Sequence, residues 1–433
     1  MADVLLIYPQ PEEIKQRRFG FSLNLLYLAA VLRQASHKIT AYVDYSIEPF
    51  DADKLNRHLE KSQVVIIEFD AFPLKRTVNI RHGEEVVRYI KDKFPHKKII
   101  VFGYDFVLFP RQQDRADFTL AAEPEKNILK AVDIVTGRVP EPAEFNPEPL
   151  GHLDELPFPD RGLLSPFAES GGSIDSEPHL AKSTLIETSR GCPARCVFCQ
   201  RKGWQKHIRT HTPDYVVREF ALLHQQQYKN IWIIDDNFTH NLERAKEILK
   251  ALKAQKVTQS MKIALSSWAH IDEEFLKLAR EACVSIISFG VESANESILN
   301  FYKKRIDLEK FRQLIAFADE LGLYTVGNFI LGAPMETDAT ITGTFHYILE
   351  TPFDQVNIKI LDYMVGSELY ERLPPEKKGT NRHIFACKEN DLNDFPLEVL
   401  RGKIDSFLEQ FRKSRKNRLK EKMKQCGPPY FLL

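Results

Sequence analysis

Three cysteines fall within eight residues in the stretch Cys192-Pro193-Ala194-Arg195-Cys196-Val197-Phe198-Cys199, at the spacing C-x3-C-x2-C. The other three cysteines of the chain stand far apart. Crowded thiolates repel one another unless a cation lies between them, and structural zinc sites usually have four protein ligands. Clusters of the 4Fe–4S type are normally held by four cysteines, so three thiolates leave one iron open. The stretch therefore predicts a 4Fe–4S cluster on Cys192, Cys196 and Cys199 with one free coordination position.

This spacing, with the aromatic Phe198 directly before the last cysteine, resembles the radical S-adenosylmethionine (SAM) superfamily. The resemblance implies that the open iron binds the amino and carboxylate groups of SAM. It also implies that one electron from the cluster splits SAM to a 5′-deoxyadenosyl radical, which abstracts hydrogen from an unactivated position. An electron donor such as flavodoxin or ferredoxin is then expected. The alternative from another class is a non-enzymatic iron–sulfur or zinc protein that binds a partner.

Strands and helices alternate after the apolar run that leads into the cysteines. We expect six strands with five helices between them, at 184–188, 231–234, 262–265, 285–289, 324–331 and 355–360. This alternation predicts a partial (β/α)6 barrel over residues 181–365. Barrel enzymes carry their chemistry at the carboxyl ends of the strands, which is where the cysteine loop begins.

Polar residues gather where these strands end, and the resemblance gives each group a part of SAM to bind. The ammonium group is assigned to the end of the second strand, the methionine carboxylate to the third, the ribose diol to the fourth and the adenine to the fifth. The candidates are Asp235, Asp236 and Asn237 for the ammonium group, Ser267 for the carboxylate, Glu292 for the ribose diol, and Asn328 and Gly332 for the adenine. Asp and Asn are also common helix N-caps, and glycines often serve packing alone, so structural roles remain open.

Residues 1–137 read as a separate α/β domain. Five short apolar runs, at 3–8, 38–43, 63–68, 98–102 and 118–121, are separated by helical patterns such as 23–34. This alternation predicts a doubly wound (Rossmann-like) parallel sheet, which would bind a ligand at the carboxyl ends of its strands.

The order of features resembles the cobalamin-binding-like domain that precedes the barrel in one class of the superfamily. The matching segments are 26–32, Ser36-His37-Lys38, Asp44, Ala116-Asp117 and Glu123-Pro124-Glu125. The sequence departs from that pattern at three strand ends, which read Gly103-Tyr104, Glu68-Phe69-Asp70 and Ala122-Glu123. A side chain in place of glycine hinders close approach of a ligand to the backbone. Two interpretations stay open: cobalamin binding, or a domain that keeps the fold and only shapes the active site or docks a partner.

The remaining segments are a linker and a tail. Residues 138–180 are rich in proline and acids and read as a connector. Residues 366–433 predict a mainly helical segment with one long helix from Glu398 to about Lys424, whose last turns are basic. We expect these bases to complement the helix dipole rather than to bind nucleic acid.

Composition narrows the function classes. The 433 residues include 60 basic and 60 acidic side chains, so no general affinity for polyanions is expected. No secretory signal stands out, and no apolar run approaches the length of a membrane span. Unpaired, clustered cysteines favour the reducing cytoplasm.

The resemblance implies cobalamin-dependent methylation of a small-molecule, lipid or natural-product substrate. The alternative is cobalamin-independent cyclisation, C–C bond formation or rearrangement. A methylthiotransferase is excluded because that class brings a second cluster on N-terminal cysteines, and no cysteine precedes Cys192.

Overall fold

The fold is described from a computed structural model, which covers two compact units. One unit spans Met1–Ser183 and the other spans Thr184–Leu432, with Leu433 grouped with the first. The structure describes residues 1–11, 21–69, 79–109, 113–121, 123–140, 142, 145–148, 150–164, 182–200, 207–378 and 382–426, with side chains as far as residue 422. Much of the predicted linker, together with Asp70 and Ala122, lies outside these residues.

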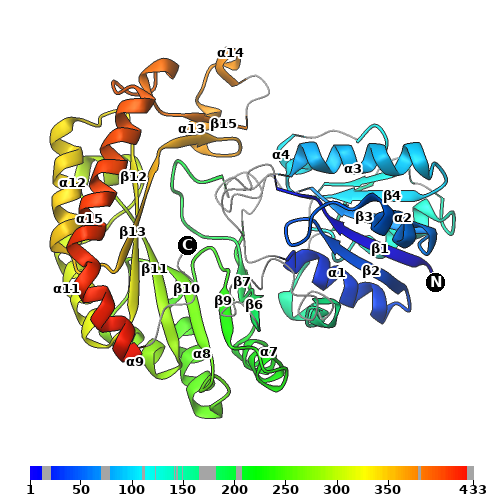
Figure 1. Cartoon of the computed structure of the whole chain (residues 1–433), viewed down its shortest axis with the longest axis horizontal. Coiled ribbons are helices and arrows are strands. Elements are labelled where there is room, and N and C mark those ends of the chain that lie inside the picture. The colour runs from blue at the N-terminus through cyan, green and yellow to red at the C-terminus, as the bar shows by residue number, and fades with distance from the viewer. Residues whose placement is uncertain are drawn as a thin grey trace. The chain divides into compact units, whose positions relative to one another are not determined.

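The N-terminal unit is a five-stranded parallel sheet in the order β2-β1-β3-β4-β5 (Figure 1). Its strands are β1 (Asp3–Tyr8), β2 (Lys38–Asp44), β3 (Val64–Glu68), β4 (Lys98–Phe102) and β5 (Phe118–Leu120). Its helices are α1 (Leu23–Gln34), α2 (Ala52–Glu60), α3 (Ile80–Lys93), α4 (Asp105–Leu108) and α5 (Ile128–Val135).

Both faces of this sheet are buried. Along β1, Leu6 packs with α1 and α5 in one core, whereas the next residue, Ile7, packs with α2 and α3 in another. Alternate side chains of a strand point to opposite faces, so helices on both sides explain why the strands are continuously apolar. The predicted doubly wound sheet is confirmed.

The second unit is built on a six-stranded sheet in the order β13-β12-β11-β10-β9-β6. The strands are β6 (Ser183–Ile186), β9 (Asn230–Ile233), β10 (Lys262–Trp268), β11 (Val284–Glu292), β12 (Tyr324–Leu331) and β13 (Gln355–Ile360). The helices between them are α7 (Pro213–Gln225), α8 (Leu242–Gln255), α9 (Glu273–Glu281), α10 (Glu296–Phe301), α11 (Leu308–Glu320) and α12 (Asp338–Glu350). The expected six-stranded β/α architecture is confirmed, with α10 as a short addition before α11.

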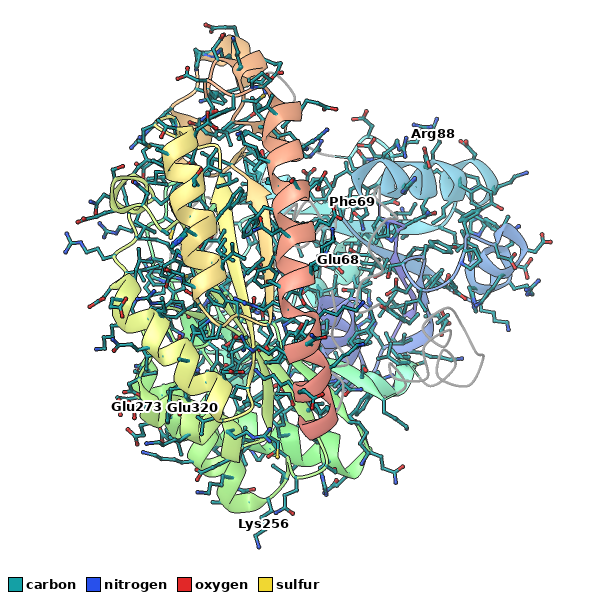
Figure 2. The ribbon with its side chains drawn as sticks, turned by 60° about the vertical axis from the view of Figure 1, so that its left-hand side comes forward. Glu68, Phe69, Arg88, Lys256, Glu273 and Glu320 are labelled. Carbon is teal, nitrogen blue, oxygen red and sulfur yellow. The ribbon has the colours of Figure 1, made fainter. Side chains whose placement is uncertain are left out.

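The C-terminal segment adds a small hairpin and a long helix. Its elements are β14 (Asp362–Met364), α13 (Glu368–Glu371), α14 (Pro375–Lys378), β15 (His383–Phe385) and α15 (Leu397–Cys426). Figures 1 and 2 both show α15 running beside α12, where the rings of Phe407 and Phe345 stack at 4.0 Å. Leu400 and Ile404 of α15 pack on Leu331 of β12, so the helix covers the β12–β13 side of the sheet.

The basic residues near the end of α15 bind the chain itself. Arg415 donates to the carbonyl oxygens of Phe353, Leu349 and Thr351 at 2.8 to 3.1 Å. Lys422 donates to Asp354 at 2.6 Å, and the Asp354 side chain is fully buried. These cations therefore attach the helix to the turn between α12 and β13, which is a more specific role than the expected complement to the helix dipole.

Within the described part of the chain, every helix is either too short or too polar to cross a membrane.

Candidate active site

A short antiparallel ribbon frames the cysteine loop. β7 (Ser189–Arg190) leads into the loop and β8 (Arg209–Thr210) follows it, with Ser189 opposite Thr210. Gly191 starts the loop at φ +92°, and a Cβ there would lie 2.8 Å from the carbonyl oxygen of His207. Glycine alone tolerates this conformation together with this close approach. The ribbon therefore fixes where the loop leaves the strand.

Cys196 is the deepest of the three thiols, at 6% exposure, whereas Cys192 and Cys199 are partly exposed. Burial raises the pKa of the Cys196 thiol to about 12; the Lys304 ammonium opposes this rise, and Cys199, Glu292 and Cys192 add to it. The three thiols thus lie within electrostatic range of one another. In the described ranges, however, no three His, Cys, Asp or Glu side chains are grouped closely enough to hold a metal ion.

Other parts of the unit hold the loop in place. The backbone N–H of Leu369, in α13, donates to the carbonyl oxygen of Val197 at 3.0 Å. The ring of Phe198 meets Tyr302 edge to face, with centroids 5.1 Å apart. Gln200, directly after the last cysteine of the motif, is completely buried. Neither polar atom of its side-chain amide has a hydrogen-bond partner among the residues that the structure describes.

Asp235, after β9, ties the end of that strand to the approach to the cysteine loop. Its carboxylate accepts from the backbone N–H of Thr188 at 2.6 Å, from the Thr188 hydroxyl at 2.5 Å and from the Ser189 hydroxyl at 2.7 Å. Burial raises its pKa to about 6, although these hydrogen bonds and Arg244 favour the charged form. Both carboxylate oxygens are therefore already bound by the chain.

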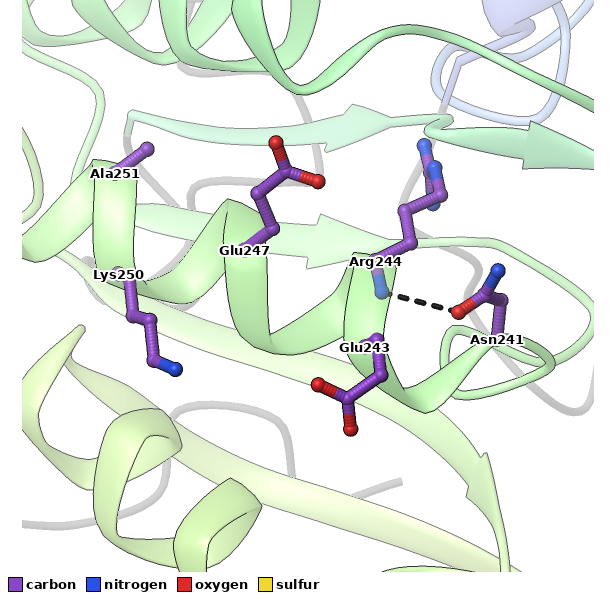
Figure 3. Close-up of a pocket in the computed structure, with 6 residues that line it drawn as sticks. All are labelled: Asn241, Glu243, Arg244, Glu247, Lys250 and Ala251. Carbon is purple, nitrogen blue, oxygen red and sulfur yellow. Dashed lines mark hydrogen bonds between the residues drawn. The ribbon is translucent and has the colours of Figure 1, made fainter.

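Arg244 supports the same region from α8. Its guanidinium donates to the carbonyl oxygens of Thr188 and His211, at 2.8 and 2.7 Å. Figure 3 shows this side chain extending from the first turn of α8, where its backbone N–H is capped by Asn241. The pocket in that figure is lined entirely by α8 and its cap, and it contains none of the predicted site residues.

A second polar network joins the ends of β9 and β10. The Asn237 side-chain oxygen accepts from the backbone N–H of Trp268 at 3.2 Å and from the Thr239 hydroxyl at 3.1 Å. Thr239 in turn shares a 2.6 Å hydrogen bond with Ser267. Asn237 and Ser267 are therefore brought together, and Asp236, half-buried, stands next to them in the chain.

Glu292, at the end of β11, forms a buried ion pair. Its backbone lies at φ +73°, which is uncommon for a residue other than glycine and occurs often at functional sites. Lys304, with its side chain only 3% exposed, binds the Glu292 carboxylate at 2.6 Å and the carbonyl oxygen of Gly290 at 2.8 Å. A Cβ on Gly290 would lie 2.7 Å from that carboxylate, so glycine makes room for the pair.

Asn328 lies in the sheet wall, where it bridges three strands. Its amide nitrogen donates to the Ser288 hydroxyl at 2.8 Å and to the carbonyl oxygen of Phe289 at 3.0 Å, and its oxygen accepts from Asn357 at 3.1 Å. Gly332 follows at the end of β12, where its backbone N–H donates to Glu336 at 3.2 Å.

Two residues that matter here, Gln200 and Arg244, were not singled out from the sequence. Gln200 follows the motif without any pattern of its own, and Arg244 reads as an ordinary residue of an exposed helix. Lys304 belongs to the basic run 303–305 after the fourth strand, where the resemblance implies a basic residue and a solvated charge run is the equal alternative. Only the folded chain gives these three side chains their buried contacts.

A polar cluster also lies in the N-terminal unit, at the carboxyl end of β3. Glu68, which is 4% exposed, accepts from the Asn24 amide at 2.7 Å and from the Ser22 hydroxyl, and its own backbone carbonyl accepts from Asn79 at 3.1 Å. In a sheet with this strand order, β1 and β3 flank the switch point at which such folds bind ligands.

The chain is similar to known proteins of one superfamily. The model of the radical SAM superfamily matches residues 186–348. An uncharacterized methyltransferase of Pyrococcus horikoshii is 27% identical over 392 residues, covering 85% of this chain and 82% of the relative. The anaerobic magnesium-protoporphyrin IX monomethyl ester cyclase of Cereibacter sphaeroides is 23% identical over 375 residues, covering 80% of this chain but only 59% of the cyclase.

A solved structure shares the overall fold. TsrM, a radical SAM methyltransferase from Kitasatospora setae solved with cobalamin and a 4Fe–4S cluster, matches with a TM-score of 0.68 at 14% identity, over 88% of this chain and 76% of TsrM. At that identity the likeness establishes the fold alone. The superfamily match and the relatives named above together show that this chain is a radical SAM enzyme, related to methyltransferases and cyclases of that superfamily.

Proposed function

We propose that this enzyme binds a 4Fe–4S cluster on Cys192, Cys196 and Cys199 and uses it to cleave SAM. When bound, such a cluster supplies the electron that splits SAM into methionine and a radical able to abstract hydrogen. One observation carries the proposal: in the cysteine loop that follows β7, Cys196 lies within electrostatic range of the buried Glu292–Lys304 pair.

The residues present fit this cluster by the chemistry of the donor set. Three thiols lie on one loop, and the high pKa of Cys196 means that loading the cluster must release a proton from it. Three thiolates give the loaded site excess negative charge, and the buried Lys304 ammonium, although it is paired with Glu292, offsets part of that charge.

Binding of SAM is assigned to residues around this loop. Glu292 is the proposed acceptor for the ribose diol, and Asn328 and Gly332 border the proposed adenine position. Asp236, in the group of polar residues at the end of β9, is the proposed partner of the ammonium group, and the neighbouring Asp235 carboxylate accepts from Thr188 and Ser189. Asn237 and Ser267 hold the ends of β9 and β10 in register beside it.

We further propose that the N-terminal unit binds cobalamin, which would supply the methyl group in a methyl transfer. The strand order and the polar cluster of Glu68, Ser22 and Asn24 at the switch point suit a ligand rich in amides. Tyr104 replaces a glycine of the related domains, and its hydroxyl donates to Glu123 at 3.3 Å. A cobalamin tail must pass this side chain.

We favour methylation over cyclisation because, of the two relatives named above, the methyltransferase matches over a larger share of both chains than the cyclase does. The side chains on β12 and β13 favour a substrate with polar groups. Three half-buried amides, those of Gln355, Asn357 and Asn328, are joined there by hydrogen bonds. These amides already bond one another, and a pure hydrocarbon would keep solvent from their remaining donor and acceptor positions without replacing it. The electron donor is proposed to be a flavodoxin or a ferredoxin.

The test is anaerobic reconstitution followed by measurement of iron, sulfide, bound cobalamin and 5′-deoxyadenosine. We expect four irons per chain, a cobalamin absorption spectrum, and 5′-deoxyadenosine formation that Cys196→Ala abolishes while the chain stays folded. Zinc in place of iron would reject the enzyme proposal. An iron–sulfur enzyme that takes up no cobalamin would reject methylation in favour of cyclisation or rearrangement.

A further inference from the structure

Gln200 is a buried amide for which the described structure offers no partner. Its side chain has no exposed surface, and neither its amide nitrogen nor its carbonyl oxygen makes a hydrogen bond within the described residues. A buried polar group without a partner costs about 1–3 kcal/mol, so an amide that leaves both ends unpaired is expensive. A leucine or methionine would fill the same space without that cost. The amide therefore calls for a partner that the described residues do not supply.

Its position in the chain indicates what that partner is. Gln200 directly follows Cys199, and the backbone N–H of Cys199 donates to the carbonyl of Cys196 at 3.1 Å, which turns the chain back toward the deepest thiol. The loop is also held by Leu369, which donates to Val197, and by Tyr302, which packs on Phe198. The side chain of Gln200 is thus buried in the protein immediately beside a proposed cluster ligand.

We infer that the side-chain N–H of Gln200 donates a hydrogen bond to a sulfur of the bound cluster, either an inorganic sulfide or a cysteine thiolate. This inference rests on the proposed cluster. Gln200 is then a positioning and tuning residue, and it takes no part in bond breaking. Hydrogen bonds to the sulfurs are one of the factors that set the potential of an iron–sulfur cluster. Donation to sulfur stabilises the more negative, reduced cluster and raises its midpoint potential.

Two measurements separate this role from a structural one. In the SAM-free, cluster-loaded protein, Gln200→Met is expected to shift the reduction equilibrium about tenfold toward the oxidised cluster, a fall of about 59 mV for one electron. The readout is a potentiometric titration followed by EPR. In the cluster-free protein, the same substitution is expected to leave the thermal midpoint unchanged or raised, because it removes an unpaired amide.

Gln355→Met is the matched control, because that amide has protein partners. Gln355 donates to Asn357 and accepts from Tyr324, at 3.3 and 3.4 Å. Its loss should lower the thermal midpoint of the cluster-free protein and leave the potential of the cluster unchanged. Gln200→Asn, which shortens the amide by one methylene, serves as a second variant if Gln200→Met does not load a cluster, and the same fall in potential is expected.

An unchanged potential in a fully loaded Gln200 variant would overturn the inference, whatever happens to SAM binding. A drop in the thermal midpoint of the cluster-free variant without a change in potential would assign Gln200 to packing and overturn it equally. Failure of the parent protein to assemble any iron–sulfur cluster would instead reject the proposed function. The two failures are therefore distinguishable.

Discussion

At the scale of single residues, buried charge is concentrated beside the cysteine loop. Glu292 and Lys304 neutralise each other, and Lys304 also lies near Cys196. Such a pair is costly to break, because removing one partner leaves an uncompensated buried charge. The pair therefore stabilises the fold, and its Glu292 carboxylate is also the proposed hydrogen-bond acceptor for the ribose diol of SAM.

We expect Glu292→Gln to weaken SAM binding by about 10- to 100-fold, because a hydrogen bond to a charged group contributes about 1.5–3 kcal/mol. The measurement is the change in the EPR signal of the reduced cluster as SAM is added. Glu296→Gln, at an exposed position of α10, is the control and should leave the titration unchanged. Normal SAM affinity in Glu292→Gln would contradict the assigned role.

Asp235 gives the protein a pH-dependent element. Its folded-state pKa of about 6 lies above the ordinary value of 3.8 for this side chain, so the folded state holds its proton more firmly than the unfolded state. Its contribution to stability is therefore full below pH 3.8 and is lost as the pH rises through 6, by at most about 3 kcal/mol. Asp235→Asn should remove this part of the pH dependence of unfolding. An identical stability profile between pH 4 and 6 in both proteins would refute it.

At the scale of elements, α15 is attached by specific contacts as well as by its apolar face. Arg418 and Lys422 both bind Asp319 and Asp354, and Asp354 would otherwise be a buried carboxylate without a cation. Burial raises the pKa of Asp354, while Lys422 opposes that rise. Ion pairs with Asp319 and Asp354 thus attach the end of α15 to the second unit.

Replacing Lys422 by Met should lower the free energy of unfolding by up to about 3–5 kcal/mol, because the buried Asp354 carboxylate then keeps, of its two ion pairs with α15, only the longer 3.4 Å contact with Arg418. Lys413→Met, on the same helix, breaks only the exposed pair with Glu409 and should cost under about 1 kcal/mol. Chemical denaturation of the two variants side by side makes the comparison. Equal stabilities would show that the cations of α15 are ordinary surface charges.

At the scale of the whole molecule, the chain carries separate cores. One core covers the six-stranded sheet, and two others cover the faces of the five-stranded sheet. The proposed cluster and SAM residues all lie in the second unit, whereas the proposed cobalamin cluster around Glu68 lies in the first. Each unit is therefore expected to load its own cofactor.

Withholding cobalamin from the full-length protein should leave cluster assembly intact and 5′-deoxyadenosine formation within about twofold. Methyl transfer to an identified substrate should be lost under the same conditions. Both products can be followed by chromatography in one anaerobic reaction. Loss of the EPR response to SAM when cobalamin is absent would show instead that the first unit is needed to build the SAM site.

Local sequence was sufficient for most of the fold. The helix predicted at 23–34 is found at Leu23–Gln34, and six strands of the second sheet were expected, because apolar periodicity is a local property. Helix α2 was missed, because only Leu55 and Leu59 of its nine residues are buried. The paired strands β7 and β8 are two residues each, too short to leave a pattern.

The sequence by itself determined the cysteine loop and the strand ends around it, because a three-thiol motif and apolar runs are encoded by neighbouring residues. Tertiary structure alone decided how the polar residues are used. It engaged the carboxylate of Asp235 with Thr188 and Ser189, paired Glu292 with Lys304 and turned the bases of α15 inward. It also buried Gln200 where the described residues offer its side chain no hydrogen-bond partner. Charge and hydrogen-bonding capacity are visible in a sequence, but partners that lie 12 to 68 positions apart are chosen only when the chain folds.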